Sequence, residues 1–198
     1  MTLSHDDGSI MPPRRAEGLP HRAGPRPRTT PWAPHIQREQ LAPQEMLTAL
    51  AARVFALPDI EERPIPRAEP PERGLWLRDV IPKGPADAFL QEREIGHFHP
   101  WDRSMHIALP PELAPRAVDA GWAEVHPAAL AGLAPKNLVM LYGPRDRHEL
   151  DVIFGIVLEA YRHAGGKAPM TPGSTPAPGK RKESVIGLAR SRKGMSQI

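Results

Sequence analysis

Proline confines regular secondary structure to the middle of this chain. The sequence has 26 prolines among 198 residues, about 13%, where roughly 5% is usual. Residues 1–42 are rich in Pro and Arg with almost no periodic apolar pattern, so we predict a disordered N-terminal segment. Residues 165–198 start with two glycines followed by several prolines, which predicts a flexible tail. The folded domain is therefore expected at residues 43–164.

Within residues 43–164 the apolar pattern changes between helical and strand periods. It predicts helices at 43–57, 112–120 and 146–164, and strands at 74–77, 93–99, 104–109 and 137–142. Residues 59–73 contain four prolines and are predicted to be irregular. Because most of these strands are neighbours in sequence, we predict an α+β fold, a small antiparallel sheet with helices packed on one face.

Two helix ends carry specific signals. Asp146 and Glu149 have the spacing of a capping box, with Asp in place of the usual Ser or Thr. Gly121 stands where a glycine closes a helix, and Pro115 is tolerated because it lies in the first turn. These signals fix the ends of two of the predicted helices.

Four of the nine histidines fall within thirty residues: His97, His99, His106 and His126. Residues two apart on a strand point to the same face, so His97 and His99 project together. A turn centred on Asp102-Arg103 would pair His99 with His106, whose Cβ atoms would then lie about 5 Å apart. His126 follows a predicted helix and is expected to close over the group from a loop. The sequence therefore predicts one histidine-lined site.

Three roles for these imidazoles stay open. One histidine could act as general base while another stabilises a developing oxyanion, and we favour His99 and His106 for this pair. Neutral imidazoles also bind Zn²⁺ or Fe²⁺, with Glu94, Asp102 or Glu124 supplying a carboxylate. Histidine spacing alone is a weak metal signal, so no metal ligand is assigned. In the third role, the imidazoles are purely structural and only form hydrogen bonds with backbone groups and carboxylates inside the domain.

Four further side chains are candidate ligand-binding residues. Trp101 and Trp122 neighbour the histidines in sequence and would make a pocket largely apolar, as ligand sites usually are. Tyr142 and Arg145 join a predicted strand to a helix N-terminus, where Arg145 could pair with an acidic ligand. Core packing and a solvated loop are the competing interpretations.

Charge and composition exclude several classes of protein. Cysteine is absent, which excludes disulfides, thiolate metal sites and a cysteine nucleophile. No secretory signal and no apolar run of about 20 residues is present, which predicts a soluble cytoplasmic protein without a membrane anchor. Residues 165–198 carry seven Lys and Arg against one acidic residue, a basic tail that could bind an acidic partner, although nucleic-acid binding is not favoured.

Several motifs in a fixed order resemble the luciferase-like domain of fungal hispidin-type luciferases and their uncharacterised bacterial relatives. They are REIGHFH, SMHIAL, AGWAEVHP and LVMLYGPRD, at residues 93–99, 104–109, 120–127 and 138–146. The fungal enzymes oxidise a hydroxylated pyrone with molecular oxygen and emit light, without a known metal or organic cofactor. The resemblance therefore implies an oxygen-using pocket at the four histidines and no cofactor. Light emission is not carried over, because this chain lacks their hydrophobic N-terminal segment and nothing indicates the luciferin pathway.

The function that we expect is a histidine-lined small-molecule site. It could belong to a cofactor-independent oxygenase, an oxidoreductase acting on an enol or phenolic substrate. The first alternative is a non-catalytic ligand-binding or interaction protein whose basic tail binds an acidic partner. The second is a histidine-ligated metal-dependent oxygenase or hydrolase.

Overall fold

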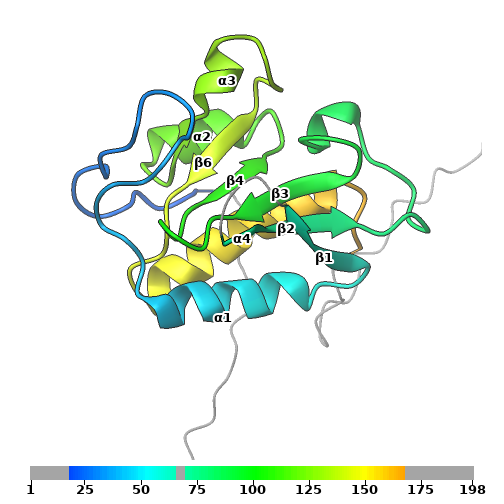
Figure 1. The fold of residues 1–198 in the computed structure, drawn as a ribbon, viewed down its shortest axis with the longest axis horizontal. Helices are drawn as coiled ribbons and strands as arrows, with labels where there is room; N and C mark the ends of the chain where they lie inside the picture. The colour runs from blue at the N-terminus through cyan, green and yellow to red at the C-terminus, as the bar shows by residue number, and fades with distance from the viewer. Residues whose placement is uncertain (1–17, 66–69, 168–198) are drawn as a thin grey trace, which may run out of the picture.

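The computed structural model describes residues 18–65 and 70–167, which form a six-stranded antiparallel sheet with helices (Figure 1). The strands lie in the order β1-β2-β3-β4-β6-β5. Their bounds are β1 Ile60–Ile65, β2 Glu72–Leu77, β3 Glu94–Phe98, β4 Met105–Ala108, β5 Ala123–Val125 and β6 Leu138–Leu141. The helices are α1 Gln44–Phe55, α2 Ala114–Asp119, α3 Pro127–Leu130 and α4 Arg147–His163, with a 3₁₀ turn at Ala86–Ala88. The predicted α+β class is confirmed.

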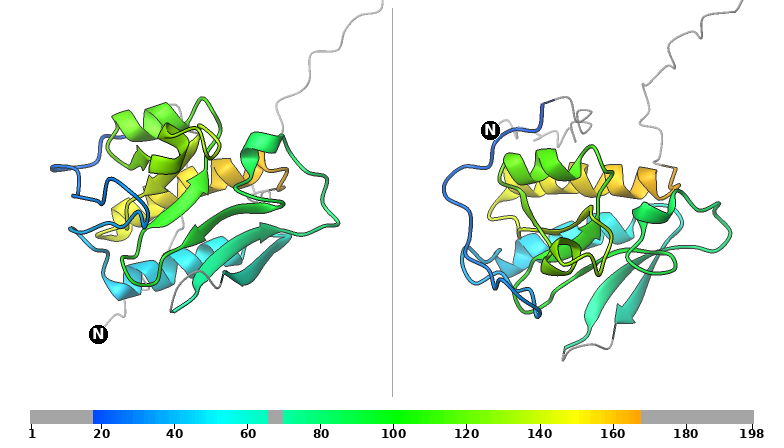
Figure 2. Two further views of the ribbon diagram at one scale, coloured as in Figure 1. Left: turned by 45° about the horizontal axis from the view of Figure 1, so that its top comes forward. Right: turned by 90° about the horizontal axis from the view of Figure 1, so that it is seen from above.

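The long helices α1 and α4 lie side by side against one face of the sheet (Figure 2). Their apolar stripes meet the inward-facing strand residues in one core, which α2 extends toward β5. Examples of core residues are Leu50, Val54, Ala117, Ile107, Leu141, Ile153 and Val157. Burying one such aliphatic side chain contributes roughly 1.5–3 kcal/mol, so this face provides most of the hydrophobic stabilisation.

The helix-end signals behave as predicted. Asp146 Oδ1 accepts a hydrogen bond of 2.8 Å from the backbone N–H of Glu149, which caps the first turn of α4. Gly121 has a φ of 82° directly after α2, a backbone conformation that side chains with a Cβ rarely adopt. The start of α4 and the end of α2 are therefore determined by residues that are close to them in the sequence.

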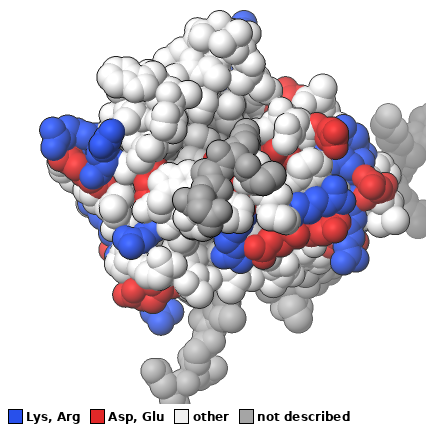
Figure 3. Space-filling view, in the orientation of Figure 1, with Lys and Arg blue, Asp and Glu red and all other residues white. Residues whose placement is uncertain are grey.

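Two strands were not predicted. Residues 60–65 were expected to be irregular but form the edge strand β1, which pairs with β2. Between its buried ends, β1 is mostly exposed, so it shows no apolar alternation, and its Pro64 is tolerated because the strand is at the edge. The three-residue β5 is too short to show a period. Ion pairs between Arg63 and Glu61 and between Arg73 and Glu62 cover the β1–β2 edge, where basic and acidic side chains alternate (Figure 3).

The prediction of disorder for residues 1–42 is wrong for residues 18–42. This stretch, called the N-terminal strap below, crosses the domain with Arg22, His35 and Gln37 buried. Long-range polar contacts hold it: Arg22 pairs with Glu149 on α4, and the backbone N–H of Gln37 donates to Asp102 at 2.7 Å. Such contacts leave no trace in local composition, so a Pro-rich stretch is easily taken for disorder. Residues 1–17 and the predicted basic tail beyond residue 167 lie outside the described residues.

Among the helices of residues 18–65 and 70–167, none combines the length and the apolar composition that a membrane span requires.

Candidate functional site

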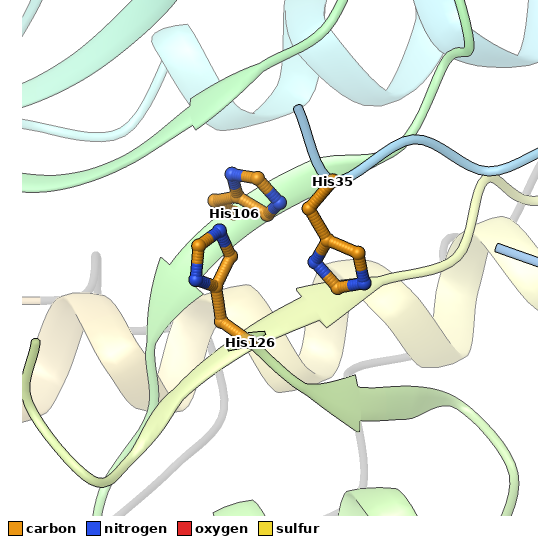
Figure 4. A group of neighbouring side chains, drawn as sticks. All are labelled: His35, His106 and His126. Carbon is orange, nitrogen blue, oxygen red and sulfur yellow. The ribbon is translucent and has the colours of Figure 1, made fainter. Parts of the chain in front are cut away.

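Five histidines from separate parts of the chain form one group, called the histidine cluster below: His35, His97, His99, His106 and His126. The ring of His106 lies at its centre. Its centroid is 4.3 Å from that of His99, 4.4 Å from His126, 5.2 Å from His97 and 5.4 Å from His35. All are buried except His126, which is partly exposed. The structure therefore brings the four predicted histidines together and adds a fifth, and Figure 4 shows His35, His106 and His126 converging.

The pairing of β3 with β4 places three of these rings on one face of the sheet. Phe98 and Ile107 turn to the opposite face and join the core, as the alternation predicted. The register differs from the prediction, since His106 lies opposite His97 and not opposite His99. The hairpin is tighter than expected: Arg103 has a φ of 62°, and the backbone N–H of His99 donates to Ser104. This shift of two residues leaves every side chain on its predicted face.

Gly96 lets β3 approach β4 closely beneath these rings. A Cβ at Gly96 would lie 2.4 Å from the backbone oxygen of His106, closer than real Cβ contacts allow. The residue that precedes His97 on β3 therefore has to be glycine for the sheet to keep this spacing.

Carboxylates orient the two histidines of β3 and its hairpin. His97 Nδ1 lies 2.6 Å from Glu94 Oε1, and His99 Nδ1 lies 3.1 Å from Ser104 Oγ. Ser104 Oγ itself donates to Asp102 at 2.8 Å, so it accepts from His99. Because a carboxylate only accepts hydrogen bonds, both rings carry a proton on Nδ1 when neutral, and the Nε2 lone pair of each lies on the side of Glu72.

A third carboxylate orients His35. Its Nε2 lies 2.5 Å from Glu124 Oε1, and the other oxygen of Glu124 accepts a 3.0 Å hydrogen bond from Tyr142 Oη. Nδ1 of His35 is buried without a hydrogen-bond partner. In neutral His35 the proton therefore lies on Nε2 and the Nδ1 lone pair remains available. Burial and the charge of Glu124 raise the pKa of Tyr142, which keeps this hydroxyl a donor.

The electrostatics of the cluster favour uncharged rings at its centre. Burial holds the pKa of His106 well below its usual value, and the neighbouring histidines lower it further. Burial also lowers the pKa of His97, although Glu94 opposes this effect. Neutral imidazoles offer lone pairs, so the centre of the cluster can accept a proton or bind a metal ion.

The four predicted ligand-binding side chains divide into two pairs. Trp101 stacks on His99, with the ring centroids 5.1 Å apart, and Tyr142 reaches the cluster through Glu124. Trp122 belongs instead to the hydrophobic core, where its indole N–H donates to the backbone oxygen of Pro20. Arg145 pairs with Glu149 at the start of α4. Trp122 and Arg145 thus have structural partners away from the histidines.

A narrow hollow without room for a water-sized molecule lies on the core side of the sheet, and no histidine lines it. Its lining includes Leu50, Phe98, Met105, Leu141 and Ile153. The rings of the histidine cluster are in contact with one another, so the predicted histidine-lined pocket for a small molecule stays a prediction.

Two overlapping triads within the cluster have the spacing of metal ligands. His97, His99 and His106 form one, and His35, His106 and His126 form the other. In each triad, one ring nitrogen per histidine lies within 4.8 Å of the others. No metal ligand was predicted from the sequence, because the spacing of histidines along a chain does not show that three lone pairs meet.

Two residues of this site were not predicted from the sequence. His35 lies in the segment predicted to be disordered, and no local pattern connects it to the other histidines. Glu72 lies in the stretch predicted to be irregular, yet it begins β2, and its carboxylate is 3.6 Å from His97 Nε2 and 4.0 Å from His99 Nε2. Extending the predicted strand at 74–77 by two residues would have placed Glu72 beside β3.

Comparison with known proteins agrees with the resemblance of the motifs. Residues 92–160 match the family described as Luciferase domain. The chain is 30% identical over 155 residues to a luciferase of Armillaria mellea and 28% identical over 164 residues to one of Neonothopanus nambi. Each alignment covers 70% of this chain but only 58% of the relative's length. No solved structure matches the chain.

The matched region runs from β3 through most of α4 and contains His97, His99, His106 and His126. His35 and Glu72 precede it. The ordered motifs and the family match thus both fall on the part of the chain that carries the strand histidines, and residues 92–160 are similar to the Luciferase domain family.

Proposed function

We propose that this domain is an oxidoreductase that uses molecular oxygen to oxidise an enol or phenolic small molecule at the histidine cluster. The relatives named luciferases support an oxidation, and light emission is not part of the proposal. His97, His99, His106 and His126 surround the reacting group in this proposal, and His35 completes the site.

The observation that carries the proposal is the chain of contacts from Tyr142 through Glu124 to His35. His35 Nε2 donates its proton to Glu124 Oε1, and the two atoms are 2.5 Å apart. Nδ1 of His35 is buried without a hydrogen-bond partner. An imidazole that donates one ring proton to a carboxylate and keeps the other ring nitrogen without a hydrogen-bond partner is the usual arrangement of a general base. His35 therefore replaces His99 as our candidate base, with neutral His106 beside it.

The reaction begins when His35 Nδ1 takes the proton of the substrate hydroxyl. The resulting enolate or phenolate is electron-rich: one of its carbons gives two electrons to molecular oxygen, the oxidant, and forms a C–O bond, and the peroxide anion takes the proton back from His35 to become a hydroperoxide. Glu124 stabilises the imidazolium formed on His35. The partly exposed side chains of Trp101 and His126 mark the side from which a planar substrate approaches.

The test is oxygen uptake by the full-length protein with a panel of hydroxypyrones, catechols and cyclic enols. We expect the His35→Ala variant to lose at least tenfold in kcat when it is assayed at a temperature at which circular dichroism shows it to be folded. His148→Ala is the matched control, because His148 is exposed on α4 outside the cluster. Full turnover in His35→Ala, or no oxygen uptake with any member of the panel, contradicts the proposal.

A further inference from the structure

We infer that His97, His99 and His106, together with Glu72, form a binding site for one divalent transition-metal ion. The site lies on the face of the β2–β3–β4 strands opposite the hydrophobic core, and its four side chains are buried. It goes beyond the proposed function, because metal binding does not require that the domain oxidises a substrate.

The first argument is the position of the ligand atoms. One nitrogen from each of the three histidines lies within 4.8 Å of the other two. Glu72 Oε2 lies 3.6 Å from His97 Nε2, and Glu72 Oε1 lies 4.0 Å from His99 Nε2. These separations are too long for hydrogen bonds. Ligands that share one tetrahedral ion at 2.0–2.1 Å are about 3.3 Å apart, so the two Glu72 separations need to shorten by less than about 1 Å and no pair of histidine nitrogens by more than about 1.5 Å.

The second argument is the protonation of the rings. His97 and His99 use their Nδ1 protons for Glu94 and Ser104, which leaves each Nε2 lone pair on the side of Glu72. Histidines that bind metal characteristically donate their other ring proton to a carboxylate or another acceptor, which fixes the tautomer. The surrounding contacts therefore already select the form of each ring that binds a metal.

The third argument is the central ring. His106 is 7% exposed, and its Nε2 is buried without a hydrogen-bond partner. An unsatisfied buried polar atom costs roughly 1–3 kcal/mol, a cost that a coordinate bond removes. The unpartnered nitrogen is thus an observation, independent of the spacing, that points to a missing ligand.

The charges and the donor types indicate the class of ion. Glu72, Glu94 and Asp102 place three carboxyl groups within 4.0 Å of the two rings of β3 and its hairpin, which suits a dication. Imidazole nitrogen with one carboxylate is a donor set for Zn²⁺, Fe²⁺, Co²⁺ or Ni²⁺ and not for Ca²⁺ or Mg²⁺, which prefer oxygen ligands.

The second histidine triad is a poorer ligand set. His126 Nδ1 accepts the backbone N–H of Ala128 at 3.0 Å and thereby caps α3. Neutral His126 consequently carries its proton on Nε2, so neither nitrogen offers a lone pair without losing that cap. His35 then keeps its Nδ1 lone pair for the base role proposed above.

The test is a titration of full-length protein, stripped with EDTA and dialysed, with Zn²⁺ by calorimetry and with Co²⁺ by visible absorption. We expect one ion per chain and a d–d band for Co²⁺ bound by nitrogen and oxygen. Glu72→Gln should weaken binding at least tenfold and change the Co²⁺ spectrum, and His99→Ala should abolish the band. Glu72→Gln keeps the size of the side chain, so it serves as the binding test if His99→Ala fails to fold.

Two control variants separate this site from others. His148→Ala and His35→Ala should both bind Co²⁺ with unchanged stoichiometry and spectrum. The inference is overturned if neither ion binds at micromolar concentration, if Glu72→Gln binds as the unsubstituted protein does, or if His35→Ala abolishes binding. Oxygen uptake is followed separately, so metal binding without turnover contradicts only the proposed function, and turnover without metal binding contradicts only this inference.

Discussion

Replacing Glu149 with Gln tests how the N-terminal strap is attached to the domain. Glu149 is a buried carboxylate in the first turn of α4 and joins two arginines. It accepts hydrogen bonds from Arg22 Nε at 3.3 Å and from a terminal nitrogen of Arg22 at 3.1 Å. The backbone N–H and the Nε of Arg145 donate to it at 2.8 Å and 2.7 Å. An amide at this position keeps the shape but loses the charge and one acceptor oxygen.

The expected cost follows from the burial of the partner. The side chain of Arg22 is only 3% exposed, so Glu149→Gln leaves a buried guanidinium without its counter-charge. Removing one member of a buried ion pair typically costs 3–5 kcal/mol. Because Gln keeps one acceptor, we expect the lower end, about 3 kcal/mol. With an m value of about 2 kcal/mol/M, the urea midpoint falls by about 1.5 M.

The pH dependence gives a second measurement of the same contact. Burial alone would raise the pKa of Glu149, but the hydrogen bonds from Arg145 and Arg22 outweigh it and hold the pKa below the ordinary 4.5. A carboxyl with a depressed pKa in the folded state contributes its stability above the ordinary value and loses it as the pH falls through the folded value. The difference between the two proteins should therefore be largest at neutral pH and shrink below about pH 4.5.

Urea denaturation followed by circular dichroism measures both effects, and Asp151→Asn is the matched control on the same helix. Asp151 pairs with Arg53, but its side chain is 68% exposed, and such surface pairs contribute about 0–1 kcal/mol. If Glu149→Gln costs no more than Asp151→Asn, or if its cost is the same at pH 3 and pH 7, the attachment does not depend on this carboxylate.

Three further substitutions test the sheet and the site. Gly96→Ala should cost about 2 kcal/mol or more in urea denaturation, because the new Cβ would meet the backbone oxygen of His106; an unchanged midpoint contradicts this packing. Gly155→Ala, in the interior of α4 with no atom within 4 Å of the added Cβ, should instead raise stability by about 1 kcal/mol in the same assay. Tyr142→Phe removes the hydrogen bond to Glu124 and should cost about 1.5 kcal/mol in thermal unfolding, whereas no loss would mean that water replaces the hydroxyl.

The elements that could be predicted are those with a signal of their own. The cap of Asp146, the glycine after α2 and the alternation of residues 104–109 each act over a few residues, so each appears in the sequence and again in the structure. The same alternation predicts that His97, His99 and His106 share a face, even though the exact pairing of the two strands was missed. The face to which a side chain points depends only on whether its position along the strand is odd or even. The register between two strands depends instead on the geometry of the hairpin loop that joins them.

The parts that could not be predicted depend on long-range contacts. His35 and Glu124 are 89 positions apart, and Arg22 and Glu149 are 127 positions apart. Neither member of these pairs has a local pattern that identifies its partner. Glu72 likewise becomes part of the site only because β2 pairs with β3. The sequence therefore locates the half of the site that lies on the strands and their hairpin, with His97, His99 and His106. The half that the strap contributes, with His35, is seen only in the tertiary structure.

This division has a consequence for the two proposals. Arg22 holds the strap that carries His35, whereas His97, His99 and Glu72 belong to the sheet or its hairpin. Loosening the strap with Glu149→Gln should therefore reduce any reaction that needs His35, while Co²⁺ still binds with its stoichiometry and spectrum unchanged. Loss of both properties in this variant would mean that the two halves form one cooperative unit, in which the contact of Gln37 with Asp102 takes part. In that case the coupling runs through His106 and His126, because each of these rings contacts both His35 of the strap and a histidine of the sheet.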